Sequence, residues 1–248
     1  MEPPLAPLVD TAGAARVTGI ASRRVRAALL IACGWLTAVP ARASAQSADD
    51  VQLWMPLVFQ GSFAGAGRFS AELQPRFDEN VSSADRVTIR TAVGREVSKH
   101  VTWLVGHAWI RFFHDAGHEQ RAWEQATISG AAFGWAAATR VRLEERWLPR
   151  VAHPSLRVRV MERVSRAVRP HSAWSVAASD EVGLTLNGTE GGPARGLDRN
   201  RAYVGLGRRL TSALSAEGGY LWEAQFLPGT APRHHHVLQM GVTWRIPH

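Results

Sequence analysis

The chain contains 248 residues, of which 46% are hydrophobic, and it has a formal net charge of +8 at pH 7. A single β domain of this length is common, and no segment approaches the ~18 consecutive apolar residues of a transmembrane helix. Nearly all of the positive charge is arginine, interspersed with Glu and Asp along the chain. This excludes a clustered basic surface that follows a phosphate backbone, so we expect no nucleic-acid partner.

The first residues have the features of a secretion signal. Three arginines within residues 23–26 form a basic region, Ala27–Val39 is a short apolar run, and Ala43-Ser44-Ala45 has the small-x-small pattern of a cleavage site. The apolar run is too short to span a bilayer. We therefore predict that residues 1–45 are an N-terminal extension and a signal peptide for Sec export, and that residues 46–248 form one mature domain.

Two alternatives concern this segment. Leu30-Ile31-Ala32-Cys33 resembles a lipoprotein box, in which Cys33 would carry the lipid, although the apolar run continues past it. A start at Val17 would give a signal of ordinary length. Cys33 is also the chain's single cysteine, so the predicted mature chain has no disulfide. A closed, hydrogen-bonded barrel is one way to hold such a secreted protein together.

Apolar and polar residues alternate with a period of two from Val51 onward, and helical periodicity is nearly absent. In residues 139–147, for example, Val141 and Leu143 alternate with Arg140 and Arg142. The alternation and the turn signals between its segments predict eleven strands, at residues 51–60, 68–77, 86–93, 101–112, 119–130, 139–147, 156–164, 173–186, 199–210, 214–226 and 238–246. Because bacterial single-chain barrels have an even number of strands, either one strand is missed or one lies outside the wall.

The predicted fold class is all-β, an antiparallel up-and-down transmembrane β-barrel of about 10–12 strands. Short connections alternate with longer ones, as in the hairpins of outer-membrane barrels. Trp135 and Trp147 share one face and lie about 40 Å apart along a strand, or roughly 30 Å after tilting, which suits the two aromatic girdles of a membrane barrel. A soluble periplasmic β-sandwich binding protein is the alternative, because it too has one apolar and one polar face.

Several short runs, in this order, resemble a known family. They are Leu53-Trp54, HEQRAWEQ (118–125), RVRLEER (140–146), SDEV (179–182), LDRNRAYVGLG (197–207), EGGYLWE (217–223) and HHVLQMGVTW (235–244). Together they are similar to the bacterial outer-membrane β-barrel family catalogued as domain of unknown function 2490. The resemblance covers the whole mature chain and implies a barrel with no established activity. One departure is the end of the chain, which lacks the terminal aromatic residue by which the insertion machinery recognises such barrels.

The polar face of the predicted strands is rich in arginine, and buried charges must be paired or hydrated. Two hypotheses follow: an ion-pair network that fills a narrow lumen, or a porin-like, narrow passage that prefers anions. Glu72, Glu124, Glu144, Asp180 and Glu223 are the expected partners of the arginines. The residues predicted to line the lumen are Arg76, Arg90, Glu124, Arg140, Arg142, Glu144, Arg146, Arg157, Arg159, Arg163, Asp180 and Arg201.

We identify no catalytic residue, no metal site and no cofactor from the sequence. Ser129, Ser175, Ser179 and His107, with Asp180 or Asn187 to orient the histidine, could serve a lipid- or glycan-modifying enzyme with a site at the rim, but no local motif fixes their geometry. His234-His235-His236 is interpreted as a solvated tract, because consecutive histidines of a strand point to opposite faces and only His234 and His236 could share a metal ion. Gly205-x-Gly207 lacks the third glycine and the helix of a nucleotide-binding loop.

The prediction for the whole molecule is a non-enzymatic barrel in the outer membrane of a Gram-negative bacterium. The expected partners are outer-membrane lipid and the barrel-insertion machinery. The sequence sets neither a solute nor an oligomeric state.

Overall fold

The computed structural model describes residues 50–63, 65–114, 117–227 and 229–246. The predicted signal peptide, the cleavage site and Cys33 lie outside the described residues. In the described part of the chain every regular element is a strand, and no helix there is long and apolar enough to cross a membrane.

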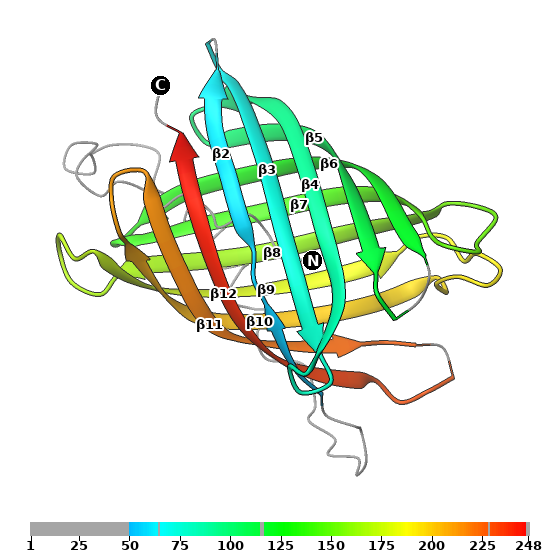
Figure 1. The fold of residues 1–248 in the computed structure, drawn as a ribbon. Coiled ribbons are helices and arrows are strands. Elements are labelled where there is room, and N and C mark those ends of the chain that lie inside the picture. The colour runs from blue at the N-terminus through cyan, green and yellow to red at the C-terminus, as the bar shows by residue number, and fades with distance from the viewer. Residues whose placement is uncertain (1–49, 64, 115–116, 228, 247–248) are drawn as a thin grey trace.

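Twelve strands form one sheet that closes on itself (Figure 1). They are β1 (Asp50–Trp54), β2 (Leu57–Phe63), β3 (Gly67–Asp78), β4 (Ser83–Ser98), β5 (Val101–Phe112), β6 (His118–Ala132), β7 (Trp135–Trp147), β8 (Ser155–Ala167), β9 (Trp174–Thr185), β10 (Gly196–Arg209), β11 (Leu214–Gln225) and β12 (Arg233–Ile246).

β1 and β2 occupy a single position in the wall. Both pair in parallel with β12, at Trp54 opposite Gln239 and at Leu57 opposite Val242, and the register is the same on both sides of the interruption. Both also pair with β3 in one common register. The break falls at Met55-Pro56, where the proline has no N–H to donate to a neighbouring strand. The carbonyl of Pro56 still accepts a hydrogen bond from Val242 N at 2.9 Å.

The wall therefore has eleven positions, and the barrel closes through a parallel pair. All other neighbouring strands are antiparallel. All eleven predicted strands are present, and the expectation of an even number is wrong. With an odd number of positions the first and last strands must run the same way, so residue 50 and residue 246 lie at opposite ends of the barrel.

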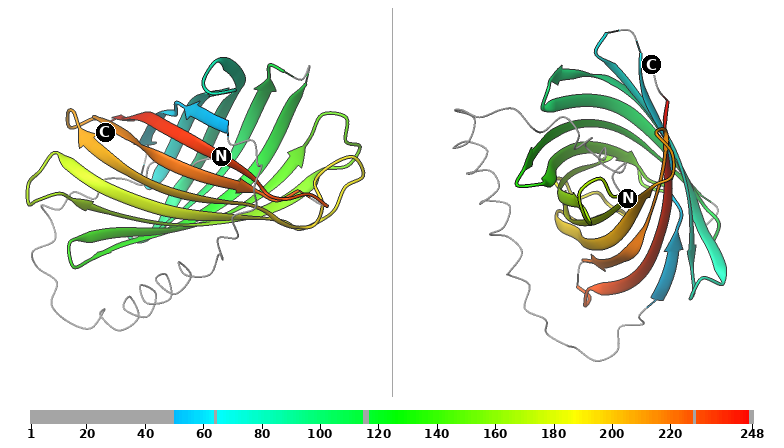
Figure 2. Two further views of the ribbon diagram at one scale, coloured as in Figure 1. Left: turned by 90° about the horizontal axis from the view of Figure 1, so that it is seen from below. Right: turned by 90° about the vertical axis from the view of Figure 1, so that its left-hand side faces the viewer.

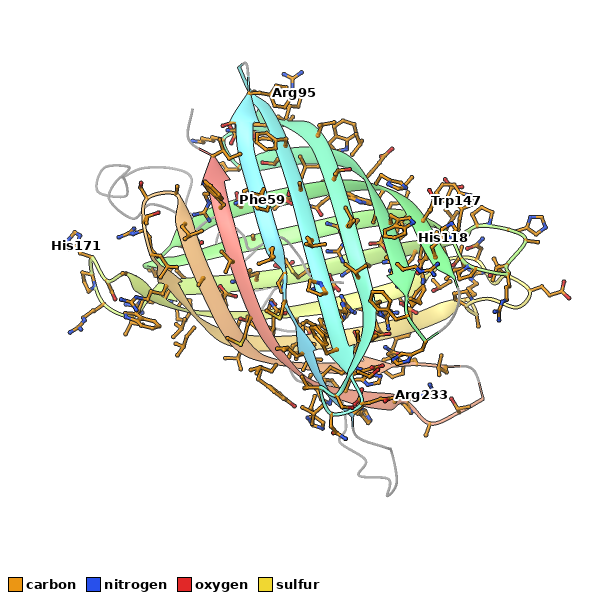
Figure 3. All side chains as sticks on the ribbon, viewed as in Figure 1. Phe59, Arg95, His118, Trp147, His171 and Arg233 are labelled. Atoms are coloured by element: carbon orange, nitrogen blue, oxygen red, sulfur yellow. The ribbon has the colours of Figure 1, made fainter. Side chains whose placement is uncertain are left out.

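The two ends of the barrel differ in their connections. At one end, which we call the short-turn end, the strands are joined by residues 64–66, 99–100, 133–134, 168–173 and 210–213. At the other, the long-loop end, the connections are residues 79–82, 113–117, 148–154, 186–195 and 226–232. Figure 3 shows His171 and Trp147 at these opposite ends. The predicted alternation of connection lengths is confirmed.

Burial alternates along the strands, with charged side chains inside and apolar ones outside. Val141 and Leu143 are 44% and 43% exposed, whereas the alternating residues Arg140 and Arg142 are each 1% exposed. The strands encircle this interior (Figure 2). A two-sheet sandwich would bury the apolar face between its sheets, so the soluble sandwich alternative is overturned by a single closed sheet whose apolar side faces outward.

Aromatic and aliphatic residues also fill part of the interior. Trp54, Tyr203, Leu221 and Val237 form one buried cluster. A second contains Ala92, Leu104, Ala108, Ile110 and Trp123. The interior is thus filled by apolar packing as well as by charged side chains, inside the hydrogen-bonded wall.

Candidate functional site: the arginine-rich interior

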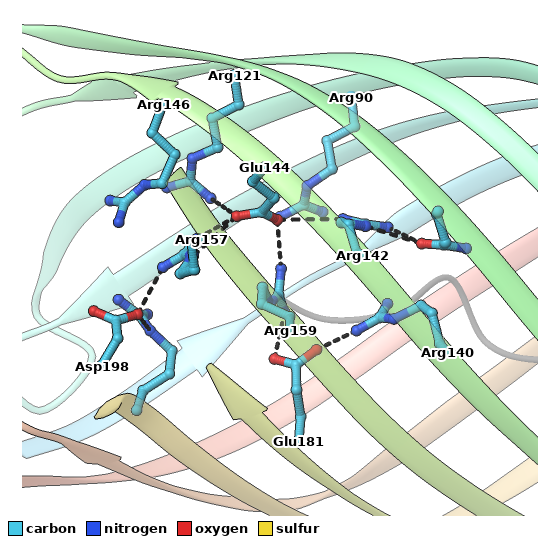
Figure 4. A network of polar contacts seen from close by, with 12 residues as sticks. Arg90, Arg121, Arg140, Arg142, Glu144, Arg146, Arg157, Arg159, Glu181 and Asp198 are labelled. Atoms are coloured by element: carbon cyan, nitrogen blue, oxygen red, sulfur yellow. Dashed lines mark hydrogen bonds and ion pairs between the residues drawn. The ribbon is translucent and has the colours of Figure 1, made fainter. Parts of the chain in front are cut away.

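Glu144 on β7 is the centre of the interior charges and is fully buried. Arg157 contacts its Oε2 at 2.5 Å and Arg159 its Oε1 at 3.0 Å, both from the neighbouring strand β8. Arg121 and Arg142 each approach it to 3.8 Å. One carboxylate is therefore shared by four guanidinium groups (Figure 4).

Three further carboxylates extend these contacts across β8, β9, β10 and β11. Glu181 contacts Arg140 and Arg159, and its distance to Arg201 is 3.5 Å. Asp198 lies 2.8 Å from Arg157 and 2.7 Å from Arg199. Glu223 contacts Arg201 and lies 3.6 Å from Arg199.

On β6, Glu119 binds Arg121 at 2.6 Å and Arg146 at 2.7 Å, which joins it to the same set. We call this connected set the arginine network. It contains eight arginines and five carboxylates, namely Arg121, Arg140, Arg142, Arg146, Arg157, Arg159, Arg199 and Arg201 with Glu119, Glu144, Glu181, Asp198 and Glu223. Because arginine stays protonated in proteins, the network carries more positive than negative charge.

Several of the interior arginines also contact neutral side chains. The Gln125 side-chain oxygen accepts hydrogen bonds from Arg142 at 2.6 and 2.9 Å, and the Arg142 guanidinium lies 4.1 Å from the centre of the Trp123 ring. The guanidinium carbons of Arg76 and Arg201 lie 3.6 and 4.9 Å from the centre of the Trp54 ring. Such contacts between arginine and an aromatic face are attractive but do not neutralise the charge.

The interior changes character along the barrel. The arginine network occupies the half nearer the long-loop end. Toward the short-turn end the inward positions carry small residues, many of them partly exposed, such as Ser70, Thr102, Thr127, Ser165 and Ser179. An ion pair between Arg163 and Glu217, at 2.6 Å, crosses this half.

Ten of the twelve residues predicted to line the lumen have buried side chains on the inner face. These are Arg76, Arg90, Arg140, Arg142, Glu144, Arg146, Arg157, Arg159, Arg163 and Arg201. Of the predicted partners, Glu72 contacts Arg90, and Glu144 and Glu223 belong to the network.

The prediction is wrong for Glu124, which is exposed on the outer face of β6. The reason is its neighbour Trp123, which points inward and covers Gly106, so that a Cβ on Gly106 would lie 2.3 Å from the indole. The pleat then turns Glu124 outward.

Asp180 also lies on the outer face rather than in the lumen. Its neighbour Glu181 takes the inward position on β9. Asp180 accepts a hydrogen bond from Asn200 at 2.9 Å and lies opposite Glu162, which accepts one from Thr139 at 2.8 Å. These four residues interrupt the apolar outer surface.

Sequence reasoning missed Glu119, Arg121, Glu181, Asp198, Arg199 and Glu217. The spacing Glu119-x-Arg121 places both side chains on one face of a strand, and this signal could have found them. Asp198 carries no such signal because it sits at an irregularity of the β9–β10 register between Leu197 and Arg199.

The candidate catalytic residues do not come together. Ser175 is buried inside on β9, whereas His107 is on the outer face of β5, where it contacts Gln120 at 3.2 Å. Asn187 holds the loop after β9 by accepting a hydrogen bond from Leu156 N at 2.6 Å. Among the described residues no group of three or more His, Cys, Asp or Glu could hold a metal ion.

Outward aromatic residues lie near both ends of the wall. Trp135 and Trp147 are the first and last residues of β7 and are 37% and 44% exposed. At the short-turn end Phe59 and Trp244 contact each other across the closing pair of strands, with ring centres 5.9 Å apart. Tyr220 and His236 make a similar contact toward the long-loop end.

The fold and the interior define the class of protein, which is a closed β-barrel with an apolar outside and an arginine-rich inside. Comparison with known proteins identifies the family. A family model described as "Protein of unknown function (DUF2490)" matches residues 51–234. The chain belongs to this family, which confirms the resemblance found in its sequence.

Two individual proteins are similar to the chain. An uncharacterized protein of Methylorubrum extorquens is 28% identical over 225 residues, covering 86% of this chain and 96% of the relative. A solved structure of a bacterial polysaccharide outer membrane secretin is 12% identical with a TM-score of 0.47 and covers 71% of this chain. The match spans 63% of the secretin chain.

Proposed function

We propose that this protein is a non-enzymatic barrel of the Gram-negative outer membrane, with a narrow interior that favours small anions. The exterior supports the membrane location. Apolar side chains on its outer face are 40–50% exposed, as at Ile89, Val141, Leu143 and Leu238, and such a surface is costly in water. Aromatic residues near both ends suit the two interfaces of a bilayer.

The observation that carries the anion preference is the composition of the arginine network. A structural filler needs as many carboxylates as guanidinium groups, because each unpaired buried charge costs free energy. Eight arginines face five carboxylates instead. Fixed positive charge in a narrow lumen lowers the barrier for anions and raises it for cations.

The passage would have a wider and a narrower half. Small, partly exposed residues line the interior near the short-turn end, whereas the arginine network fills the half near the long-loop end. Anions would therefore enter readily from the short-turn end and pass the network only when its long side chains move.

Outer-membrane lipid and the barrel-insertion machinery are the partners that this function requires, and Sec export would deliver the chain to them. Cell fractionation tests the location. We expect the protein in the detergent-extracted outer membrane, migrating faster on a gel before heating than after, as closed barrels do. Recovery in the soluble periplasmic fraction would contradict the proposal.

Planar lipid bilayers test the passage. We expect small, anion-selective conductance from the purified barrel, measured as the reversal potential across a KCl gradient. Arg142→Glu should shift that potential toward cations, while Arg166→Gln, on the outer face beside Trp135, should not. Cation selectivity, or no conductance from protein that retains heat-modifiable migration, would refute an anion passage.

A further inference from the structure

Within the network, three arginines converge on one carboxylate. Arg140, Arg159 and Arg201 extend from β7, β8 and β10 and all contact Glu181 on β9. The three arginine side chains are at most 2% exposed. We call these four residues the Glu181 cluster.

The cluster leaves several buried N–H groups without an acceptor. Within the described residues, Nε and Nη1 of Arg140, Nε of Arg159 and Nη2 of Arg201 make no hydrogen bond. Buried donors are nearly always paired, because an unpaired one loses its hydration and gains nothing in return. Four unpaired nitrogen donors on three neighbouring buried arginines are therefore unusual for a purely structural ion-pair cluster.

Neighbouring carboxylates offset only part of the positive charge of the cluster. Arg159 shares Glu144 with three other arginines. Arg142 lies directly opposite Arg159 in the β7–β8 register, and like charges placed opposite each other are destabilising. Arg201 also contacts a second carboxylate, that of Glu223. Among the described residues Glu223 pairs with one other arginine, Arg199.

We propose that the Glu181 cluster is a binding site for a small oxyanion, such as sulfate, phosphate or a small carboxylate. Guanidinium groups present paired N–H donors that match oxyanion geometry. The next inward positions toward the short-turn end are Ala138 on β7 and Ser179 on β9, so on these two strands the cluster borders the part of the interior lined by small residues. On β8 and β10 the next inward residues are the larger Met161 and Tyr203. The anion takes a place among the guanidinium groups after their long side chains separate. The site rests on the proposed function in one respect, since anions from water must reach the interior.

Binding can be measured without conduction. The probe is sodium sulfate, with sodium chloride at the same ionic strength as the reference, added at millimolar concentration to the folded, detergent-solubilised protein. The readout is the midpoint of thermal unfolding followed by tryptophan fluorescence. We expect sulfate to raise the midpoint with saturation, whereas general salt stabilisation by sulfate grows without saturation.

Two variants give opposite results if the site exists. Arg201→Gln removes the positive charge and three of the five N–H donors of the guanidinium group, so it should weaken sulfate binding about tenfold. Arg201→Lys should recover part of the binding. Glu181→Gln removes the competing negative charge and should strengthen sulfate binding, although it lowers the stability without sulfate. Arg166→Gln on the outer face serves as the control.

A merely structural role predicts that both interior variants lower stability and that neither changes the sulfate response. That result, or equal midpoints in sulfate and chloride, would overturn the site. Saturable sulfate binding to a barrel that does not conduct would support the binding site and refute the anion passage. Anion conductance without saturable sulfate binding would support the passage and refute the site.

Discussion

At the scale of single residues, the interior depends on a few shared carboxylates. Glu144 has no solvent exposure and contacts Arg121, Arg142, Arg157 and Arg159. Removing one partner of a buried ion pair costs more than the pair contributes, because the remaining charge stays buried without compensation.

We therefore expect Glu144→Gln to lower the free energy of unfolding by about 3 kcal/mol or more. Glu190→Gln, the same change in the exposed connection between β9 and β10, should alter it by less than about 0.5 kcal/mol. Urea unfolding of the two folded variants measures the difference. Equal values would show that the network contributes no stability at its centre.

A second residue-scale prediction concerns His114, in the connection between β5 and β6. Its hydrogen bond to Asp78, 3.2 Å long, raises the pKa of the imidazole above its usual value. The raised pKa means that the contact stabilises the fold below the ordinary histidine pKa, and that this contribution disappears as the pH rises through the raised value.

Asp78→Asn should lower the pKa of His114 toward that of free histidine, which NMR titration of the histidine ring can measure. Glu190→Gln is the control and should leave the His114 titration in place. If both variants titrated alike, the contact with Asp78 would not set the pKa.

At the scale of elements, Gly106 on β5 leaves room for the Trp123 ring to pack against the inner face of the wall. A Cβ there would lie 2.3 Å from Trp123 and 2.5 Å from the Thr91 carbonyl oxygen. Gly106→Ala should therefore lower the free energy of unfolding by about 1–3 kcal/mol, the usual cost of overpacking. Gly130→Ala on β6, where a Cβ meets open space, should be nearly neutral in the same urea unfolding experiment. Similar losses from both would mean that Trp123 does not pack against Gly106.

The register of the parallel pair β2 and β12, which closes the barrel, can also be tested. Val58 on β2 lies opposite Thr243 on β12, and both are buried. Paired positions in a sheet bring Cα atoms within the range that a disulfide spans. Val58→Cys with Thr243→Cys should form a disulfide, seen as altered gel migration without reductant. Val58→Cys with Gln239→Cys, four residues away on the same face, should not, and the opposite pattern would rule out this register.

Local patterns predicted the strands well because alternation is a property of each segment alone. Val51–Gln60 was predicted as one strand, and β1 and β2 fill one position in the wall. The parallel closure was not predictable in this way, since it depends on which distant strand β12 meets. The predicted inward orientation of Glu124 and Asp180 is also wrong. Their neighbours Trp123 and Glu181 point inward, and consecutive residues of a strand point to opposite faces.

At the scale of the whole molecule, the burial pattern of a soluble protein is reversed. Apolar side chains such as Val141 and Leu143 on β7 are outside, whereas most of the guanidinium groups of β7 and β8 are inside. Such an arrangement is stable when the outer face contacts acyl chains and the inner charges are paired or hydrated. The proposed function depends on the same reversal, because the excess of interior arginine could act on anions only inside an enclosed space.

Site-specific fluorescence quenching tests this claim most directly. A fluorophore on Leu143→Cys or Val160→Cys, both outward, is compared with one on Ala138→Cys, which points inward on β7, in bilayers of lipids brominated on the acyl chains. The account predicts strong quenching by the brominated chains, and little by aqueous iodide, at positions 143 and 160 but not at 138. Quenching of the two outward positions by iodide, with no effect of the brominated lipids, would contradict it.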